Sequence, residues 1–333
     1  MAKPMAQVIH KKGGPENFSW EPINVGKPAA GEVRLNSLAI GVNFADTYHR
    51  RGIPHPLVVG DPPVIVGLEG VATVVELGAD VTEFSTGDKV CYTTPPIGAY
   101  AEERVFPADK LIKVPDDIGI TDAELASILL KGLTAQYLLR ETYVVKPGDF
   151  VLIHAAAGGM GHVLCPWARH LGATVIGTVS TEEKARVARD LGCHHTINYS
   201  KGDFVDEVRA ISGGEGVHVV YESIGKTTLR QSLKCLRLRG MCAAYGHASG
   251  IPEPVDIVTE LGVPGSLFIT RPAIWHYLTP RSAMLNAAQA FFDAIKAGVV
   301  KATIARTFAL SEAGDAHRFI EARKTIGSIV LLP

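Results

Sequence analysis

The chain has 333 residues, 47% of them hydrophobic, with 33 Lys and Arg against 34 Asp and Glu. This length predicts about two domains of about 150 residues, each able to bury a core. A formal charge of -1 gives no electrostatic reason to expect a nucleic acid or an anionic membrane surface as partner.

Cysteine usage and the N-terminal segment indicate where such a chain would work. The five cysteines are scattered and form no Cys-x-x-Cys pair, so neither a disulfide framework nor a thiolate zinc site is expected. The first residues, MAKPMAQVIHKKGG, lack the apolar core of a signal peptide, and no apolar run approaches the about 18 residues of a membrane helix. We therefore expect a soluble cytoplasmic protein with reduced thiols.

The first part of the chain reads as a β domain. Between residues 5 and 120, short apolar runs are broken by Gly and Pro about every ten residues, which predicts short, mostly antiparallel strands. A helical pattern then begins at Thr121, where Glu124 three residues on fits a capping box. This helix is expected to carry the chain into a second domain.

From Asp149 onward, strand and helix patterns alternate. The apolar runs FVLIH, ATVIGTV, HHTIN, VHVVYES, MCAAYG and SLFIT are separated by helical segments, which predicts a parallel, doubly wound sheet. After Arg271-Pro272 come a long helix, a short helix and a final strand, SIVLL. These last elements would complete the first domain and make the second domain an insertion.

A glycine turn marks the dinucleotide site. Gly158, Gly159, Met160 and Gly161 follow the first of these strands and open a helix. Glycine lets the backbone approach a pyrophosphate, and the N–H groups at the helix start face the anion. A glycine cluster alone is a weak signal, but strand before and helix after are the context that supports dinucleotide binding.

The residues at the end of the second strand predict which nicotinamide cofactor is used. NAD sites usually place an acidic residue about 20 residues after the glycines, to hold the ribose hydroxyls. This chain has Gly177-Thr178-Val179-Ser180-Thr181 there, without a carboxylate to repel a 2′-phosphate. Ser180 can donate a hydrogen bond, and Lys184 is either a solvated helix lysine or a phosphate ligand. We predict NADPH rather than NADH.

Several motifs resemble those of a known superfamily. The segment 39–48, the GLEG at 67–70 and AAAGGMG resemble the medium-chain dehydrogenase/reductases. KGLTAQYLLR, INY and GSLFITRP, in the same order, resemble its quinone oxidoreductase (zeta-crystallin-like) branch, and among these the bacterial NADPH:quinone reductases. The resemblance implies an α/β fold in which a Rossmann doubly wound parallel sheet is inserted into a mostly β, GroES-like catalytic domain. The implied boundaries are 1–125 for the catalytic domain, completed by 272–333, and 126–271 for the NADP-binding domain.

The resemblance makes two positions informative about metal. Zinc alcohol dehydrogenases of the superfamily carry Cys where this chain has Asn43 and His where it has Leu68. A leucine cannot ligate zinc, and an amide replaces a thiolate poorly. We therefore expect no metal, and for Glu69 a role in orienting the backbone at the domain junction. The pair His194-His195 is expected to place one ring in the core and one at the surface.

Without a metal to polarise an alcohol, the simplest chemistry is direct hydride transfer to an electron-poor acceptor. We predict NADPH-dependent quinone reduction. The alternatives are reduction of an enone or 2-alkenal double bond and, in a different class, a cofactor-binding structural or RNA-binding role like that of a crystallin. By resemblance, Asn43 hydrogen-bonds the acceptor and touches the cofactor, while the Tyr48 hydroxyl helps to protonate the acceptor. Pro54, His55 and Pro56 replace an aromatic that relatives often carry, so the acceptor pocket is expected to differ.

The resemblance also implies further cofactor contacts. His247 stands where relatives use Asn, and we expect it to be a cofactor-loop residue that titrates near neutral pH rather than a catalytic base. The implied contacts are Thr134, Tyr137, Tyr199, Ile224, Tyr245, Gly246, His247, Ser249, Phe268, Thr270, Arg271 and Arg323. The apolar edge strand at 266–270 is expected to pair with its own copy in a homodimer, with a tetramer left open.

Overall fold

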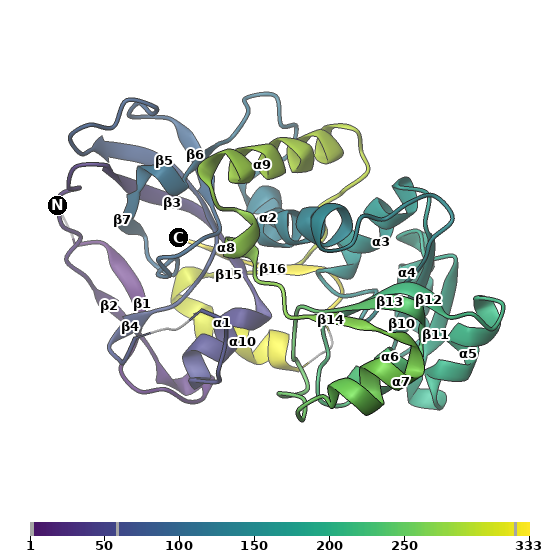
Figure 1. The fold of residues 1–333 in the computed structure, drawn as a ribbon. Coiled ribbons are helices and arrows are strands. Elements are labelled where there is room, and N and C mark those ends of the chain that lie inside the picture. The colour runs from purple at the N-terminus through teal and green to yellow at the C-terminus, as the bar shows by residue number, and fades with distance from the viewer. Residues whose placement is uncertain (1–2, 58–59, 323–324) are drawn as a thin grey trace. The chain divides into compact units, whose positions relative to one another are not determined.

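The computed structural model describes residues 3–57, 60–322 and 325–333, and the chain divides into two compact units (Figure 1). The first unit comprises Met1–Leu130, Leu278–Phe292 and Ala302–Pro333. The second comprises Lys131–Tyr277 and Asp293–Lys301. The chain thus leaves the first unit after Leu130, returns at Leu278, and enters the second unit again briefly between Asp293 and Lys301.

Two sheets form the first unit. A three-stranded sheet has the order β2-β1-β4, and a seven-stranded sheet has the order β15-β16-β3-β5-β6-β8, with β7 paired to β3. The pairings are antiparallel except for β15 with β16. The strands are β1 (Met5–Ile9), β2 (Phe18–Pro22), β3 (Glu32–Val42), β4 (Val64–Ile65), β5 (Gly70–Leu77), β6 (Lys89–Tyr92), β7 (Glu103–Pro107), β8 (Ile112–Lys113), β15 (Ile304–Ala309) and β16 (Ser328–Leu332).

The C-terminal segment of the chain contributes to the sheet of the first unit. β16 pairs antiparallel with β3, with Ile329 opposite Val42 and Leu331 opposite Ile40. These apolar residues belong to one buried cluster that fills the interior of the unit. Several of the β strands expected between residues 5 and 120 are therefore joined in one sheet by two strands, β15 and β16, from the far end of the chain.

Two helices of the first unit bear on the site. Helix α1 (Phe44–Arg51) follows β3 directly, with Asn43 as N-cap and Gly52, at φ 70°, as a left-handed C-cap. Helix α10 (Ala313–Glu321) precedes β16. The sequence analysis did not predict α1, because the helix is only eight residues long and follows the strand directly.

A six-stranded parallel sheet forms the second unit, in the order β11-β10-β9-β12-β13-β14. The strands are β9 (Phe150–Ile153), β10 (Thr174–Val179), β11 (His195–Asn198), β12 (Val217–Glu222), β13 (Leu236–Ala244) and β14 (Phe268–Thr270). The chain moves outward from β9 to β11 and then restarts on the other side of β9 with β12. The predicted doubly wound parallel sheet is confirmed, and its switch point lies between β9 and β12.

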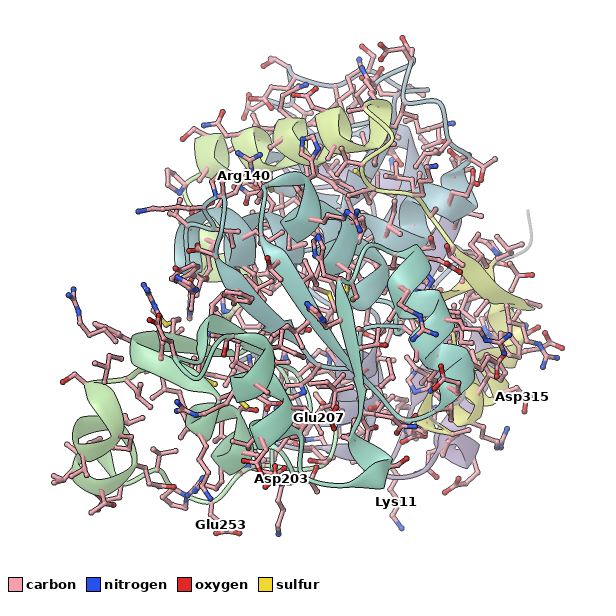
Figure 2. The ribbon with its side chains drawn as sticks, turned by 90° about the vertical axis from the view of Figure 1, so that its right-hand side faces the viewer. Lys11, Arg140, Asp203, Glu207, Glu253 and Asp315 are labelled. Carbon is pink, nitrogen blue, oxygen red and sulfur yellow. The ribbon has the colours of Figure 1, made fainter. Side chains whose placement is uncertain are left out.

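Helices cover both faces of this sheet (Figure 1). Right-handed crossovers place α3 (Gly161–His170) and α4 (Glu182–Asp190) on one face, and α5 (Phe204–Ile211) and α6 (Leu229–Lys234) on the other. Figure 2 marks the start of α5 by Asp203, whose carboxylate caps the N–H of Val205 at 2.9 Å. Short helices α7 (Val263–Gly265) and α8 (Ile274–Tyr277) flank β14 in sequence.

Two longer helices, α2 (Asp122–Tyr137) and α9 (Arg281–Lys296), each contribute residues to both units. The predicted capping box of α2 is present: the Thr121 N–H donates to Glu124 Oε2 at 2.8 Å, and the Glu124 N–H donates to Thr121 Oγ1 at 3.2 Å. The last turn of this helix widens over Leu138–Thr142. Among the residues described, no helix is long and apolar enough to cross a membrane.

Candidate active site

The glycine turn of the second unit forms the start of α3. A Cβ built on Gly161 would lie 2.0 Å from the carbonyl oxygen of Ala156, so only glycine fits there. The N-cap residue Met160 makes no side-chain capping bond. Gly158 closes the turn by donating its N–H to Ala155 O at 2.8 Å. A close-packed turn that ends at a helix start without a side-chain cap fits a pyrophosphate group.

The end of the neighbouring strand brings the predicted phosphate ligands into register. Val179 of β10 is paired with Asn198 of β11, so the next residues, Ser180 and Tyr199, leave adjacent strands at the same edge. Lys184 lies in the first turn of α4, where its N–H donates to the Thr181 hydroxyl at 3.2 Å. Partial burial lowers the pKa of the Lys184 amine. The structure therefore places Ser180, Lys184 and Tyr199 at one edge of the sheet.

Glu222 fixes the loop that follows β12, and Ser249 ties that loop to the one that follows β13. Its Oε1 accepts hydrogen bonds from the N–H groups of Ile224 (2.6 Å) and Gly225 (3.0 Å) and from the Thr228 hydroxyl (3.0 Å). The Ser249 hydroxyl in turn donates to Ile224 O at 2.8 Å. Two of the predicted cofactor residues, Ile224 and Ser249, are thus parts of one hydrogen-bonded loop pair.

A close approach of backbones joins the same loops at Gly246. Its N–H donates to Glu222 O at 3.2 Å, and a Cβ on it would lie 2.8 Å from Ser223 O. Sequence reasoning chose Gly246 but gave Glu222 no role. The sequence does offer a sign of this role. Glu222 ends an apolar strand, and a carboxylate buried there needs several hydrogen-bond donors.

Aromatic and cationic groups gather beside these loops in the second unit. The Tyr137 ring stacks on that of Tyr277 with centroids 4.2 Å apart at 13°. Burial raises the pKa of the Tyr137 hydroxyl, while the charge of Arg271 acts in the opposite direction. Burial and then the charge of Arg271 lower the pKa of His247, which favours the neutral imidazole. Thr134 and Tyr245, both close enough to influence Tyr137, complete this group.

Two of the predicted cofactor contacts, Phe268 and Thr270, lie on the edge strand β14 of the second unit. Phe268 is 52% exposed, and Thr270 pairs with Ala243 of β13. Arg323, the last predicted cofactor contact, lies outside the described residues.

In the first unit, Asn43 is held from two directions. Its Nδ2 donates to Glu69 Oε1 at 2.6 Å, and its backbone N–H donates to Asp46 Oδ2 at 2.8 Å. Glu69 Oε2 also accepts the Leu130 N–H at 2.6 Å. A Cβ on Gly41 would lie 2.2 Å from Glu69 Oε1, so glycine there makes room for this carboxylate. The buried carboxylate fixes which end of the Asn43 amide is the nitrogen.

Tyr48 lies on α1 and is 6% exposed. Its ring packs edge-on against Phe44, with centroids 5.7 Å apart, and lies 5.9 Å from the ring of His55. His55 Nδ1 is 3.2 Å from His49 Nε2. Burial lowers the pKa of His49 to about 4. The loop that differs from the relatives therefore places an imidazole beside the Tyr48 ring.

Comparisons with known proteins address the family. The profile of the alcohol dehydrogenase GroES-like domain matches residues 29–116, and that of zinc-binding dehydrogenases matches residues 159–283. A 2-haloacrylate reductase from Burkholderia sp is 65% identical over 329 residues, which are 99% of both chains. Quinone oxidoreductase 1 of Escherichia coli (strain K12) is 40% identical over 327 residues, 98% of both chains. The chain belongs to the quinone oxidoreductase branch of the medium-chain dehydrogenase/reductase superfamily.

Solved structures of this branch share the whole fold. A 2-haloacrylate reductase matches with a TM-score of 0.89 at 62% identity, covering 99% of both chains. The Escherichia coli quinone oxidoreductase complexed with NADPH matches with a TM-score of 0.94 at 39% identity, covering 99% of this chain and 100% of that one. The predicted fold, a Rossmann sheet inserted into a GroES-like domain, is confirmed.

The medium-chain reductase carries aliphatic and amide groups where zinc relatives carry ligands. Leu68 is buried at 4% exposure, and the Asn43 amide is bonded to Glu69. Among the described residues, no group of three or more His, Cys, Asp or Glu is placed to hold a metal ion.

The expectation for the histidine pair was wrong in part: His194 and His195 are both exposed, because β11 begins only at His195 and His194 turns its Nδ1 to the Val175 N–H.

Proposed function

We propose that this medium-chain reductase uses NADPH to reduce the electron-poor C=C bond of a 2-haloacrylate. The observation that carries this substrate class is the 65% identity, over 99% of both chains, to a protein named 2-haloacrylate reductase. The sequence pointed first to quinones and gave activated double bonds as the alternative, and the comparisons support a reductase of this superfamily more broadly. Quinones are the second candidate acceptor, supported by the relatives at 40–42% identity.

The cofactor assignment rests on the second unit. The turn at Gly161, with the uncapped start of α3, fits a pyrophosphate, while Ser180, Lys184 and Tyr199 would hold a 2′-phosphate. The relative solved with NADPH supports this choice. We assign cofactor binding to the predicted domain 126–271, and acceptor chemistry to the predicted domain 1–125 with 272–333.

Bound NADPH supplies a hydride. The reaction is CH2=CX–COO⁻ + NADPH + H⁺ → CH3–CHX–COO⁻ + NADP⁺, where X is the halogen. The hydride forms the new C–H bond at C3, the π electron pair moves towards the carboxylate, and a proton closes C2. No carbon–halogen bond breaks, and the two-electron reduction of the alkene balances the oxidation of the cofactor.

The residues of the first unit supply hydrogen bonds and a proton. Glu69 accepts one N–H of the Asn43 amide, and this fixes the amide so that its second N–H can donate to a carboxylate oxygen of the acceptor. Negative charge grows on that oxygen during the transfer, so a fixed donor stabilises the transition state more than the ground state. The Tyr48 hydroxyl, on α1, would deliver the proton at C2.

The decisive assay compares acceptors. Purified protein is given NADPH with 2-chloroacrylate, a naphthoquinone or a 2-alkenal, and NADPH oxidation is followed. We expect the largest kcat/KM with 2-chloroacrylate, and with NADPH deuterated at C4 the label should appear at C3 of 2-chloropropionate. Turnover of the naphthoquinone alone would contradict the 2-haloacrylate proposal and support quinone reduction instead. NADPH binding without turnover of any acceptor, with tight RNA binding, would favour the non-catalytic alternative.

We also propose that the reductase is a homodimer joined through its free edge strand. Phe268 on β14 is 52% exposed, and the neighbouring apolar side chains Leu238, Ile257, Val258 and Val263 are 71%, 74%, 63% and 78% exposed. Apolar surface of this extent beside an unpaired edge is typical of a covered interface. Phe268→Arg should convert the dimer to a monomer in light scattering, whereas Val144→Arg, at another exposed apolar position (57%), should not.

A further inference from the structure

A file of buried polar side chains runs through the first unit to the start of α1. Arg50 Nη1 lies 3.1 Å from His317 Nδ1, and His317 Nε2 lies 3.0 Å from the Tyr100 hydroxyl oxygen. The Tyr100 hydroxyl donates to Asp46 Oδ2 at 3.2 Å, and the same oxygen accepts the Asn43 N–H. Arg50, His317, Tyr100 and Asp46 are each at most 1% exposed.

Only one arrangement of protons satisfies this file. Arg50 can only donate, so His317 Nδ1 must accept, and the neutral ring then carries its proton on Nε2. That proton is donated to the Tyr100 oxygen, which leaves the Tyr100 proton for Asp46. Burial and the charge of Arg50 lower the pKa of His317 to about 3, while burial and Asp46 raise the pKa of Tyr100. The file therefore stays in this state across physiological pH.

Both ends of this row of side chains, Asp46 and Arg50, lie on helix α1. Asp46 and Arg50 are four residues apart, so both side chains leave the same face of α1, one in its first turn and one in its last. His317, on α10, and Tyr100 bridge them. Arg50 is anchored further by Gly13 O at 3.0 Å and by Glu321 Oε1 at 2.8 Å. The helix is thus gripped at both ends by groups from distant parts of the chain.

We propose that Tyr100 and His317 are positioning residues of the acceptor site: they clamp α1 and thereby set Asn43 at its N-cap and Tyr48 in its middle. This inference rests on the proposed roles of Asn43 and Tyr48. Burying four polar side chains costs free energy that an apolar packing of equal volume would not. In return, these hydrogen bonds hold the four side chains in fixed orientations. If any one of the bonds is broken, Asp46 is no longer held in place, and its contact with the Asn43 N–H is weakened.

The first test removes one oxygen from the file. Tyr100→Phe should lower kcat for the acceptor by about tenfold to a hundredfold, the scale of a misplaced catalytic group, and leave the Kd for NADPH unchanged. The matched control is Tyr92→Phe, the same change at a fully buried tyrosine of the same unit whose hydroxyl has no hydrogen-bond partner among the described residues. Equal losses of kcat in the two variants would overturn the proposal.

The second test separates positioning from simple packing. His317→Gln keeps one acceptor and one donor and should retain most of the activity, whereas His317→Leu should match Tyr100→Phe. The double variant Tyr100→Phe/His317→Leu should be no worse than either single one, because each already breaks the same file. Equal losses in the Gln and Leu variants, or additive losses in the double one, would contradict the proposal.

A third readout does not depend on any acceptor. Hydrogen exchange followed by mass spectrometry should show faster exchange for the α1 peptide 43–52 in Tyr100→Phe than in Tyr92→Phe, with the peptides of the second unit unchanged. If exchange rises while wild-type protein turns over no acceptor, the clamp stands and the proposed function fails. If exchange at 43–52 does not change, the clamp itself is wrong.

Discussion

Asn43 Nδ2 donates to Glu69 Oε1 at 2.6 Å, with the two residues 6% and 0% exposed. A carboxylate only accepts hydrogen bonds, so this contact fixes the orientation of the amide. Glu69→Gln keeps the shape but can accept through one oxygen only, while Asn43 and the Leu130 N–H both need an acceptor. We expect kcat/KM for the acceptor to fall by about tenfold to a hundredfold, measured by steady-state kinetics at saturating NADPH.

The control for this change is Glu76→Gln on the same strand, β5, where the side chain is 39% exposed and faces Arg34 at 3.9 Å. It should leave kcat/KM unchanged. Wild-type kinetics in Glu69→Gln would show that the orientation of Asn43 does not matter to the reaction.

Lys184 provides the test of cofactor choice. If its amine binds the 2′-phosphate, Lys184→Ala should raise the Kd for NADPH by about tenfold and leave the Kd for NADH unchanged, as measured by fluorescence titration. Arg186→Ala is the matched control, because Arg186 is an exposed cation on the same helix. Equal losses for the two cofactors, or none, would remove Lys184 from the phosphate site.

Local patterns were sufficient to predict the architecture of the second unit. Its central strands β9, β10 and β12 are short apolar runs buried on both faces, and the helices between the strands carry ordinary amphipathic patterns, so sequence period alone identifies them. The capping box at Thr121 is equally local. β15 was missed for the converse reason, since most of its residues are exposed and only Phe308 is buried.

The contacts that organise the site are not local, and the sequence could not predict them. Tyr100 and His317 are 217 residues apart, and Asn43 and Glu69 are 26 apart. The first pairing depends on how α10 returns to the first unit, and the second on the register of β3 against β5, and no pattern near Asn43 encodes either. Resemblance identified Asn43 and Tyr48 but gave no reason to choose His317, an ordinary histidine on an amphipathic helix.

The buried histidines predict loss of stability in acid. His49 and His317 have folded pKa values of about 4 and about 3, against 6.5 when exposed. Below pH 6.5 the unfolded chain binds protons that the folded protein does not, so stability is complete above 6.5 and falls as the pH is lowered towards 4 and 3. By pH 5 each would cost about 2 kcal/mol.

Urea unfolding at about pH 7.5 and about pH 5 measures this loss. Glutamine cannot titrate, so His317→Gln should remove about half of the pH-dependent loss in the free energy of unfolding that His49 and His317 together cause. Identical pH dependence in the wild type and His317→Gln would show that His317 does not titrate with folding.

Glu222 yields the last prediction, because its carboxylate organises the loop between β12 and α6. Its Oε1 accepts hydrogen bonds from three donors, and its Oε2 accepts one from the Ser232 hydroxyl, which also lies 2.9 Å from His154 Nε2.

Glu222→Gln places an NH2 group against one of these sets of donors, at a cost of about 1–3 kcal/mol. If the loop after β12 binds the cofactor as proposed, we expect a higher Kd for NADPH, with kcat at saturating cofactor nearly unchanged because Asn43 is untouched. Glu215→Gln, exposed in the turn before β12, is the control, and a fall in kcat with an unchanged Kd would contradict the assignment.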